Sequence, residues 1–377
     1  MKSRQHHFLN SEWKASAAEV NPEKCQMVLA FGSSALLSLP EHLDYLQKSY
    51  PNADIVFSST AGEIINGEVF DDSIVATAVA FEKTQIKSIE TNISNHENSY
   101  EAGLHLYNEL QGEELTGIFI ISDGTIVNGD ELVEGLRNNN INQIPITGGL
   151  AGDGVQFKKT VTGLNKLPSQ GNIIAIGFYG KDLIIGHGSK GGWEEFGLER
   201  TITHSKQNIV QEIDSQSALD LYKKYLGDYA NELPGSALLF PLSMKVKDTD
   251  KILIRTILAV DDEQKSMIFA GNVPEGNKVK LMRANFDNLI DASSIAAKES
   301  ISGANQQLPD LTIMISCVGR KIILDTRVWE EVKNPESILG NNKISGFYSY
   351  GGISPLTKGT SCELHNQTMT MTTFTEL

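Results

Sequence analysis

The chain has 377 residues, which predicts two or three domains rather than one. Because 40% of the residues are hydrophobic and 21% are charged, it can bury substantial cores, and its composition is not that of a disordered protein. The formal net charge of −15 argues against a nucleic-acid backbone or an anionic membrane as the main partner. We therefore expect neither nucleic-acid binding nor membrane insertion.

The N-terminal residues and the cysteines indicate the compartment. Residues 1–20 are polar and lack the apolar centre of a signal peptide. The chain has no apolar run of about 18 residues, so no transmembrane helix is expected. Three cysteines in a chain of this length favour free thiols in a reducing compartment. These features predict a cytoplasmic protein.

Residues 1–20 are expected to form a loose arm or a short capping segment, and residues 21–97 a first unit of strands and helices. Within this unit Ser38 and Glu41 have the spacing of a capping box, which predicts that a helix begins at Ser38. The apolar run at 73–81 is expected to be a strand.

Residues 98–230 are expected to form a second unit, and a Pro-Gly pair within 231–236 marks the predicted boundary to a C-terminal domain at 237–377. Helices are predicted at 98–111, 218–226 and 285–302. Strands are predicted at 159–164, 172–179, 183–188, 210–213, 252–258, 267–269 and 368–374. Strands joined both by hairpins and by helices predict mixed sheets packed with helices, which is an α/β fold, with α+β as the alternative.

A strand that runs into a turn of small residues recurs three times. The turns end in SSTAGE at 58–63, in TGGLAGD at 147–153 and in GFYSYGG at 346–352. A unit reused in this way predicts that its glycine-rich tips, at Gly62, Gly152 and Gly352, meet around a shared cavity. The alternative for the third copy is a generic strand–helix–strand unit.

The same segments resemble a known family. SSTAGEI at 58–64 and GGLAGDG at 148–154 resemble the two hallmarks of the N-terminal half of the FIST domain. Three further segments resemble the C-terminal half of the FIST domain: SCVGR at 316–320, the third turn, and LHNQT at 364–368. Two positions depart from the family pattern: Ser58-Ser59 replaces a cysteine, and Gly352 replaces a carboxylate.

The resemblance implies a sensor of bacterial signal transduction rather than an enzyme, with a FIST N-terminal domain at 21–230 and a FIST C-terminal domain at 237–377. FIST proteins are proposed to bind small ligands, amino acids among them. The NosP subgroup binds haem and reports nitric oxide to a partner histidine kinase or cyclic-di-GMP enzyme. The expected function is therefore a haem-based nitric-oxide sensor or, as the alternative, an amino-acid sensor without haem. A homodimer is compatible with both.

The ligand is expected at the strand ends and at the C-terminal motifs. The candidate ligand-binding residues are Ser59, Thr60, Gly62, Glu63, Gly149, Gly152, Asp153, Arg320, Tyr348, Tyr350, Gly352, His365 and Asn366. An arginine at a strand end can anchor a carboxylate or form a structural salt bridge. The two tyrosines alternate along a strand and share a face, so they either cover a ligand or pack.

For haem, an imidazole is the most common axial donor. His187 is the first candidate because Gly186 and Gly188 leave room for a flat macrocycle, and His204 is the second. The alternative for His187 is a partly buried histidine bonded to the backbone.

Two further readings stay open. An enzyme would use Glu63, Asp153 or Cys317 as its working group, although capping of equivalent turns explains the two carboxylates as well. A structural adaptor would show an exposed apolar patch and no closed pocket.

Overall fold

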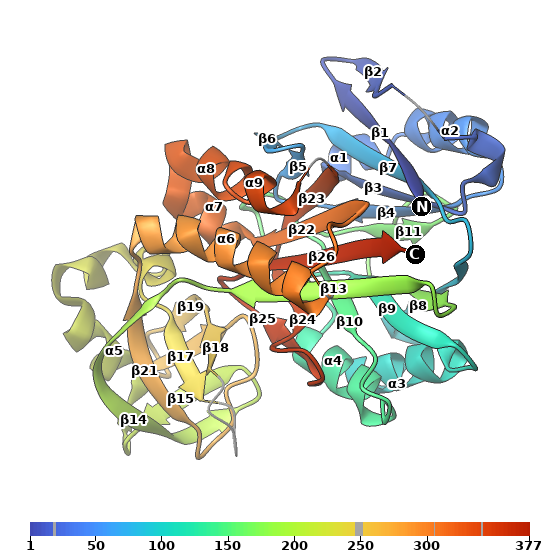
Figure 1. Cartoon of the computed structure of the whole chain (residues 1–377). Coiled ribbons are helices and arrows are strands. Elements are labelled where there is room, and N and C mark those ends of the chain that lie inside the picture. Colours follow the sequence, from blue (N-terminus) through green and yellow to red (C-terminus); the bar gives the residue numbers. More distant parts are fainter. Residues whose placement is uncertain (18–19, 246–251, 305, 341) are drawn as a thin grey trace.

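The computed structural model describes residues 1–17, 20–245, 252–304, 306–340 and 342–377. The described chain forms three six-stranded sheets and one eight-stranded sheet, with helices packed on them (Figure 1). The α/β prediction with mixed sheets is confirmed, because each of the three six-stranded sheets contains both parallel and antiparallel neighbours.

The three six-stranded sheets repeat one pattern, in which two parallel strands are followed by an antiparallel strand. In the first sheet these are β3 (Met27–Gly32), β4 (Asp54–Ser59) and β7 (Ile74–Ala80). In the second they are β9 (Leu115–Ser122), β10 (Ile146–Leu150) and β12 (Asn172–Tyr179). In the third they are β22 (Leu311–Cys317), β23 (Lys343–Ser349) and β26 (Met369–Glu376). The internal repeat is therefore threefold, and the third copy is a full member.

Each unit also donates a strand to the sheet of another unit. Beyond the first tip, β5 (Glu63–Ile65) pairs with β23 of the third unit. Beyond the third tip, β24 (Gly351–Pro355) pairs with β10 of the second. Beyond the second tip, β11 (Thr162–Leu164) pairs with β4 of the first. This cyclic exchange ties the three sheets into one body, which we call the core.

The outer strands complete the sheets. Next to the antiparallel strands lie β1 (Lys2–Leu9), β8 (Gln85–Asn92) and β13 (Leu183–Lys190). The remaining outer strands are β2 (Glu12–Ala15), β6 (Glu68–Phe70) and β25 (Cys362–His365).

The N-terminal residues are not the loose arm that was expected, because β1 and β2 form a hairpin on β7. His6 turns inward from β1, and its ring nitrogens lie 2.9 and 2.6 Å from the hydroxyls of Tyr45 and Tyr50. Buried contacts of this kind fix a segment whose polar sequence suggested mobility.

The helices cover the outer faces of these sheets. On the first sheet lie α1 (Ser34–Leu37) and α2 (Pro40–Ser49). The second carries α3 (Ser99–Leu110) and α4 (Gly129–Asn138), and the third carries α6 (Phe286–Gly303), α7 (Val318–Leu324), α8 (Val328–Lys333) and α9 (Glu336–Leu339). The expected capping box at Ser38 is wrong: Ser38 ends α1 by donating to the carbonyl of Ser34, and Leu39 precedes α2 without a side-chain cap.

The eight-stranded sheet is an insertion in the third unit, between β13 and α6. It consists of β14 (Glu194–Lys206), β15 (Ile209–Ile213), β16 (Gln216–Ser217), β17 (Leu242–Lys245), β18 (Ile252–Arg255), β19 (Ile257–Asp261), β20 (Ser266–Phe269) and β21 (Lys278–Arg283). With α5 (Ala218–Leu226) it forms a separate lobe, at the lower left of Figure 1, which we call the inserted body.

The predicted boundary at 231–236 lies inside the inserted body. Elements on both sides of it, α5 and β17, share one hydrophobic cluster, and the Tyr222 hydroxyl donates to the Phe240 carbonyl at 2.8 Å. No break between compact units falls at this point of the structure.

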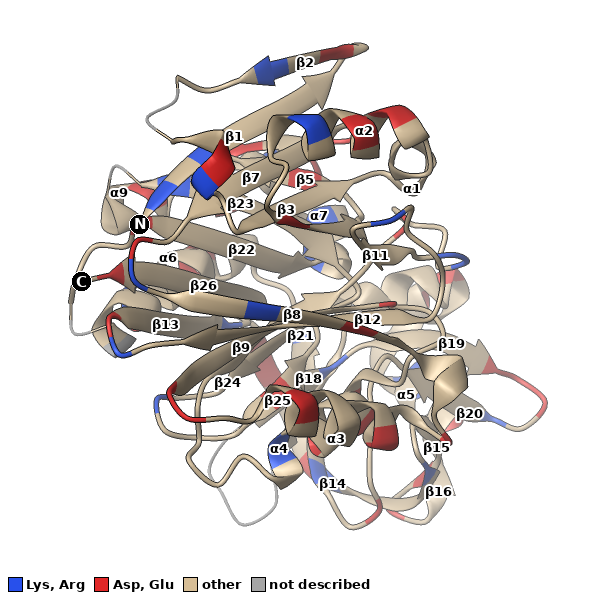
Figure 2. Ribbon diagram, turned by 90° about the vertical axis from the view of Figure 1, so that its right-hand side faces the viewer, with Lys and Arg blue, Asp and Glu red and all other residues tan. Residues whose placement is uncertain are grey.

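None of the helices that the structure describes is both long and apolar enough to cross a membrane. Acidic and basic residues are interspersed over the face shown in Figure 2. The two ends of the chain meet, because the terminal amine of Met1 lies 3.0 Å from the carboxylate of Glu376.

Candidate functional site

The three glycine-rich tips meet, as the sequence predicts. They are joined in a ring by backbone hydrogen bonds: Ala61 N–H donates to Tyr348, Gly152 N–H to Ser59, and Tyr350 N–H to Leu150, at 2.7, 2.9 and 3.3 Å. Each tip therefore donates to a different neighbour, as three related units around a common axis would.

Within the described residues, the ring is closely packed where the shared cavity was expected. Gly62 has a φ of +134°, and a Cβ there would lie 2.4 Å from the Lys321 ammonium, which donates to the Ala61 carbonyl at 2.9 Å. Gly149 and Gly352 face each other across β10 and β24. None of the cavities described below is lined by these glycines or by Gly152, so the expected cavity between the tips is corrected to a closed junction.

Asp153 caps its own turn. Its carboxylate accepts the backbone N–H groups of Phe157, Lys158 and Lys159 at 2.8, 2.9 and 2.7 Å, and also the Tyr350 hydroxyl. A carboxylate with this many donors is a structural acceptor rather than a free base. Ser59 is also a structural acceptor, since its Oγ accepts the Val161 N–H at 2.9 Å.

The carboxyl of Glu63, at the first tip, has a raised pKa. Its side chain is buried and accepts the Thr60 hydroxyl and the Ser73 backbone and hydroxyl groups. Burial raises the pKa of Glu63 to about 7, although the hydrogen bonds from Thr60 and Ser73 oppose the shift. The group lines none of the described cavities, so nothing places it beside a substrate.

Arg320 is enclosed by protein groups instead of facing a ligand. It is fully buried, pairs with the equally buried Glu331, and donates to the carbonyls of Gly191 and Leu289. The Tyr348 hydroxyl donates to the same Glu331 at 3.0 Å, and burial raises the pKa of Tyr348 well above its usual value. Of the two roles expected for Arg320, the structure therefore shows the structural salt bridge.

The C-terminal motif is also internal. The His365 ring lies 2.9 Å from the Ser354 carbonyl, and burial lowers its pKa to about 4. Asn366 is fully buried, and both polar atoms of its amide lack a partner among the described residues.

One cleft joins the tips to the inserted body, with a volume of about 280 Å³. The core contributes the loop 124–129, Leu150, Phe157 and Tyr350, and the inserted body contributes Asn208, Leu258 and residues 269–272. Among the predicted site residues only Tyr350 lines this cleft. The side formed by the inserted body was missed, because strand and turn patterns at 208 and 269–272 carry no sign of which body they will face.

The cleft has an apolar mouth. Ile126, Phe157 and Leu258 line it while 54%, 42% and 42% of their surfaces stay exposed. Phe157 stacks on Tyr350 with ring centroids 4.5 Å apart and an angle of 18°. Exposed apolar groups around a hollow are typical of a binding surface.

Comparison with known families agrees with the sequence motifs. The FIST N domain model matches residues 26–216, and the FIST C domain model matches residues 218–355. The chain belongs to the FIST family. FIST domains are sensor domains of signal transduction that bind small ligands. A search of curated proteins found no significant match.

The two FIST models meet at residues 216–218, inside the inserted body, so the lobe is divided between them. The cleft is lined by residues of both parts, since 124–129 and Asn208 fall in the first and residues 269–272 and Tyr350 in the second.

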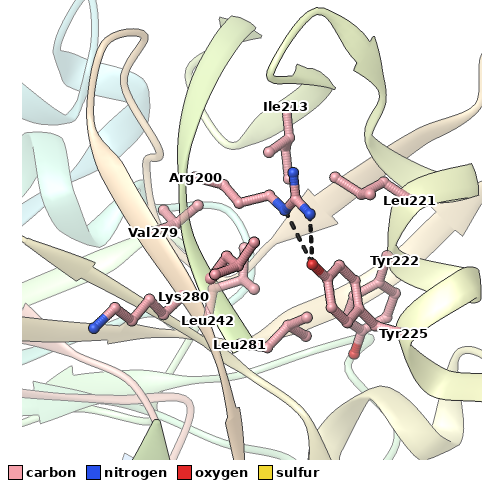
Figure 3. Close-up of a pocket in the computed structure, with 10 residues that line it drawn as sticks. Arg200, Ile213, Leu221, Tyr222, Tyr225, Leu242, Val279, Lys280 and Leu281 are labelled. Atoms are coloured by element: carbon pink, nitrogen blue, oxygen red, sulfur yellow. Dashed lines mark hydrogen bonds between the residues drawn. The ribbon is translucent and has the colours of Figure 1, made fainter. Parts of the chain in front are cut away.

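A second hollow of this FIST chain lies within the inserted body. Figure 3 shows its apolar lining, with the Arg200 guanidinium donating to the Tyr225 hydroxyl. Arg200 also pairs with Asp214 at 2.8 Å. The volume of about 20 Å³ holds roughly one water molecule, so this is a packing gap and not a ligand site. Two wider surface hollows, of about 590 and 530 Å³, contain none of the predicted site residues.

The glycines beside His187 make room for a helix rather than for haem. A Cβ at Gly186 or Gly188 would lie 2.2 or 2.0 Å from the backbone carbonyls of Ser300 and Ala296 in α6. Burial, with a smaller effect of the Lys358 charge, lowers the pKa of His187 to about 4, so its ring is neutral near pH 7.

The surroundings of His204, the second candidate axial ligand, and of His365 suit haem no better. The His204 side chain is 60% exposed on the inserted body, and its Nδ1 lies 2.8 Å from Glu275. His187, His204 and His365 line none of the described cavities, so the residues around them do not fit a haem group. Within the described residues no three His, Cys, Asp or Glu side chains are grouped as a metal site.

Cys317, the remaining candidate for a catalytic group, is also enclosed. Cys317 is buried at the start of α7, and burial raises the pKa of its thiol. A thiol with a raised pKa is a poor nucleophile.

Proposed function

We propose that this FIST protein senses a small organic ligand in the cleft between the core and the inserted body. The observation that carries the proposal is that both bodies line one hollow of about 280 Å³. Ligand sites occur preferentially between domains and combine apolar walls with a few polar groups. This cleft has a mixed lining in which polar groups slightly prevail, with exposed apolar side chains at its edge and the amides of Asn128, Asn208 and Asn272.

Two segments connect the inserted body to the core, around Gly191 on entry and around Ala284 on exit. A ligand that contacts both sides of the cleft favours the arrangement in which the sides are closest, because it gains contacts only there. We propose that the position of the inserted body carries the signal, and that a histidine kinase or a cyclic-di-GMP enzyme is the partner that reads it. The partner class rests on the family resemblance.

The size and lining of the cleft support a small organic ligand over haem. A haem sensor would need an axial imidazole at its pocket, and no histidine lines this cleft. A small organic molecule fits the volume, which lies near the lower end of the usual range of about 300–1,000 Å³ for ligand pockets.

The proposal is tested by filling the cleft. Leu258→Trp enlarges a side chain at the mouth, and Leu198→Trp is the matched control, because Leu198 is an exposed leucine of the same body that does not line the cleft. A library of small metabolites is screened by thermal shift, since a ligand that prefers the folded state raises the melting temperature. We expect compounds that stabilise the wild type and the Leu198→Trp variant but not the Leu258→Trp variant.

Compounds that stabilise all three proteins equally would place the ligand elsewhere and overturn the proposed site. If the haem prediction applies, reconstituted protein will instead show a Soret band, which this proposal does not expect.

A further inference from the structure

Resting on the proposed function, we propose that the ligand is an uncharged, planar molecule with both N–H donors and carbonyl acceptors, as in nucleobases and aromatic carboxamides. Three properties of the cleft carry this assignment: a lining without charge, amide groups on both of its sides, and an aromatic stack at its mouth.

Among the described residues, the lining of the cleft contains no charged side chain. Its residues are Gly124, Thr125, Ile126, Val127, Asn128, Gly129, Leu150, Phe157, Asn208, Leu258, Phe269, Ala270, Gly271, Asn272 and Tyr350. Taking an ion out of water without a partner is costly, so a charged ligand would find little compensation here.

Two charged groups beside the cleft neutralise each other. Asp130 pairs with the buried Arg255 at 3.0 Å and also accepts Asn272 N–H. Arg255 uses its other N–H groups on the carbonyls of Asn272 and Leu364, at 2.9 and 3.1 Å. Neither group is left to compensate a charge on a ligand.

The start of α4, which borders the cleft, does not replace a cation. The side-chain Oδ1 of Asn128 already accepts the N–H groups of Asp130 and Glu131, at 3.1 and 3.2 Å. Those two residues also place carboxylates in the first turn, which oppose the attraction of the helix dipole for an anion.

The amides provide one donor and one acceptor on opposite sides. Because the Asn128 oxygen is engaged at the helix start, its NH₂ group is the part left for a ligand. Asn208 has the reverse arrangement: its NH₂ group donates to the Phe269 carbonyl at 2.8 Å, which leaves its oxygen as an acceptor. A ligand that uses these two groups to bridge the bodies accepts from the core and donates to the inserted body.

The mouth favours a flat ring. Phe157 stacks on Tyr350 and keeps 42% of its surface exposed, so a planar ligand can extend the stack. Stacking of a base on an aromatic side chain contributes through its π-face and tolerates different rings.

The experiment uses the full chain and pairs of compounds that differ in charge but hardly in shape. Nicotinamide is compared with nicotinate and benzamide with benzoate, together with adenine, uracil and free phenylalanine, by isothermal titration calorimetry at up to about 1 mM. We expect the neutral planar members to bind roughly tenfold more tightly than their anionic counterparts. Asn208→Leu should weaken this binding by roughly tenfold, whereas Asn108→Leu, an exposed asparagine on α3, should leave it unchanged.

The outcomes separate the two proposals. Compounds that bind in the cleft are those that stabilise the Leu198→Trp variant but not the Leu258→Trp variant. If all of these compounds are charged, or if no neutral planar compound binds, the proposed ligand class is wrong while the proposed cleft stands. If neutral planar compounds bind as well to Leu258→Trp as to the wild type, the cleft itself is wrong.

Discussion

Glu63 offers a quantitative test of the structure, because it is a buried carboxyl at the junction of the three units. Burial raises its pKa in the folded protein to about 7, from an ordinary value of 4.5. The folded protein therefore binds more protons than the unfolded chain between these pH values. The contribution of Glu63 to stability is fully present below pH 4.5 and is lost as the pH rises through 7.

The size of the effect follows from the shift. The difference is 7 − 4.5 = 2.5 pKa units, and each unit corresponds to about 1.4 kcal/mol, so the full loss is about 3 kcal/mol. Between pH 6 and 8 alone the same linkage gives about 1 kcal/mol. Glu63→Gln removes the titration and keeps a carbonyl acceptor for Ser73, while the Thr60 hydroxyl can accept from the new NH₂ group.

Urea unfolding of both proteins between pH 5 and 8 measures the effect. The free energy of unfolding of the wild type should fall relative to that of Glu63→Gln as the pH rises. Other titrating groups cancel in this difference. These include His6, His187 and His365, whose pKa values burial lowers to about 4 and which act in the opposite direction below pH 6.5. Glu113→Gln, at an exposed position, controls for the change of net charge.

A difference between the wild type and Glu63→Gln that stays constant across this range would refute the reasoning. It would mean that the carboxyl is hydrated or paired with a cation in solution, and that the junction is more open than the structure shows.

Three further substitutions test other buried groups. Arg320→Met should lower the free energy of unfolding in urea by about 3–5 kcal/mol, because it leaves Glu331 buried and unpaired; a change below 1 kcal/mol would contradict the enclosed pair. Gly188→Ala should lower it by about 1–3 kcal/mol, since the new methyl would meet the Ala296 carbonyl at 2.0 Å, and an unchanged melting temperature would show that α6 lies further away. Asn366→Leu should leave the melting temperature unchanged or raise it, because both polar atoms of the amide lack a partner among the described residues; a loss above about 1 kcal/mol would reveal a bound water.

The threefold unit could be predicted because its strands are long, apolar and followed by turns of small residues. The exchange of strands could not. β5 and β11 have only three residues each, and the pairing partner of so short a strand depends on where the tips meet in space. The sequence therefore indicates where each turn lies, but not which strand the segment after the turn will pair with.

The candidate site, like the fold, could be predicted only in part. Tyr350 was predicted to contact a ligand because it was expected to alternate with Tyr348 along a strand. In the structure it lies between β23 and β24 and lines the cleft, and its contact with a ligand stays a prediction. His187 was misread because a glycine on either side shows that something approaches closely, and the approaching group is the backbone of α6. For Arg320 the sequence left two roles open, an anchor for a carboxylate and a structural salt bridge, and the buried pair with Glu331 corresponds to the second.

The arrangement of the fold limits where a signal can arise. The cyclic exchange of β5, β11 and β24 ties the three sheets together, so one unit cannot move without breaking strand pairs in another. The inserted body has no such exchange and is attached through two segments. Arg320 holds the carbonyls of Gly191, in the entering segment, and of Leu289, in the first turns of α6 after the leaving segment. A ligand in the cleft should therefore act on the angle of the inserted body about this fixed arginine. Amide hydrogen exchange should slow in the loop 124–129 and at 269–272 while the three sheets keep their protection.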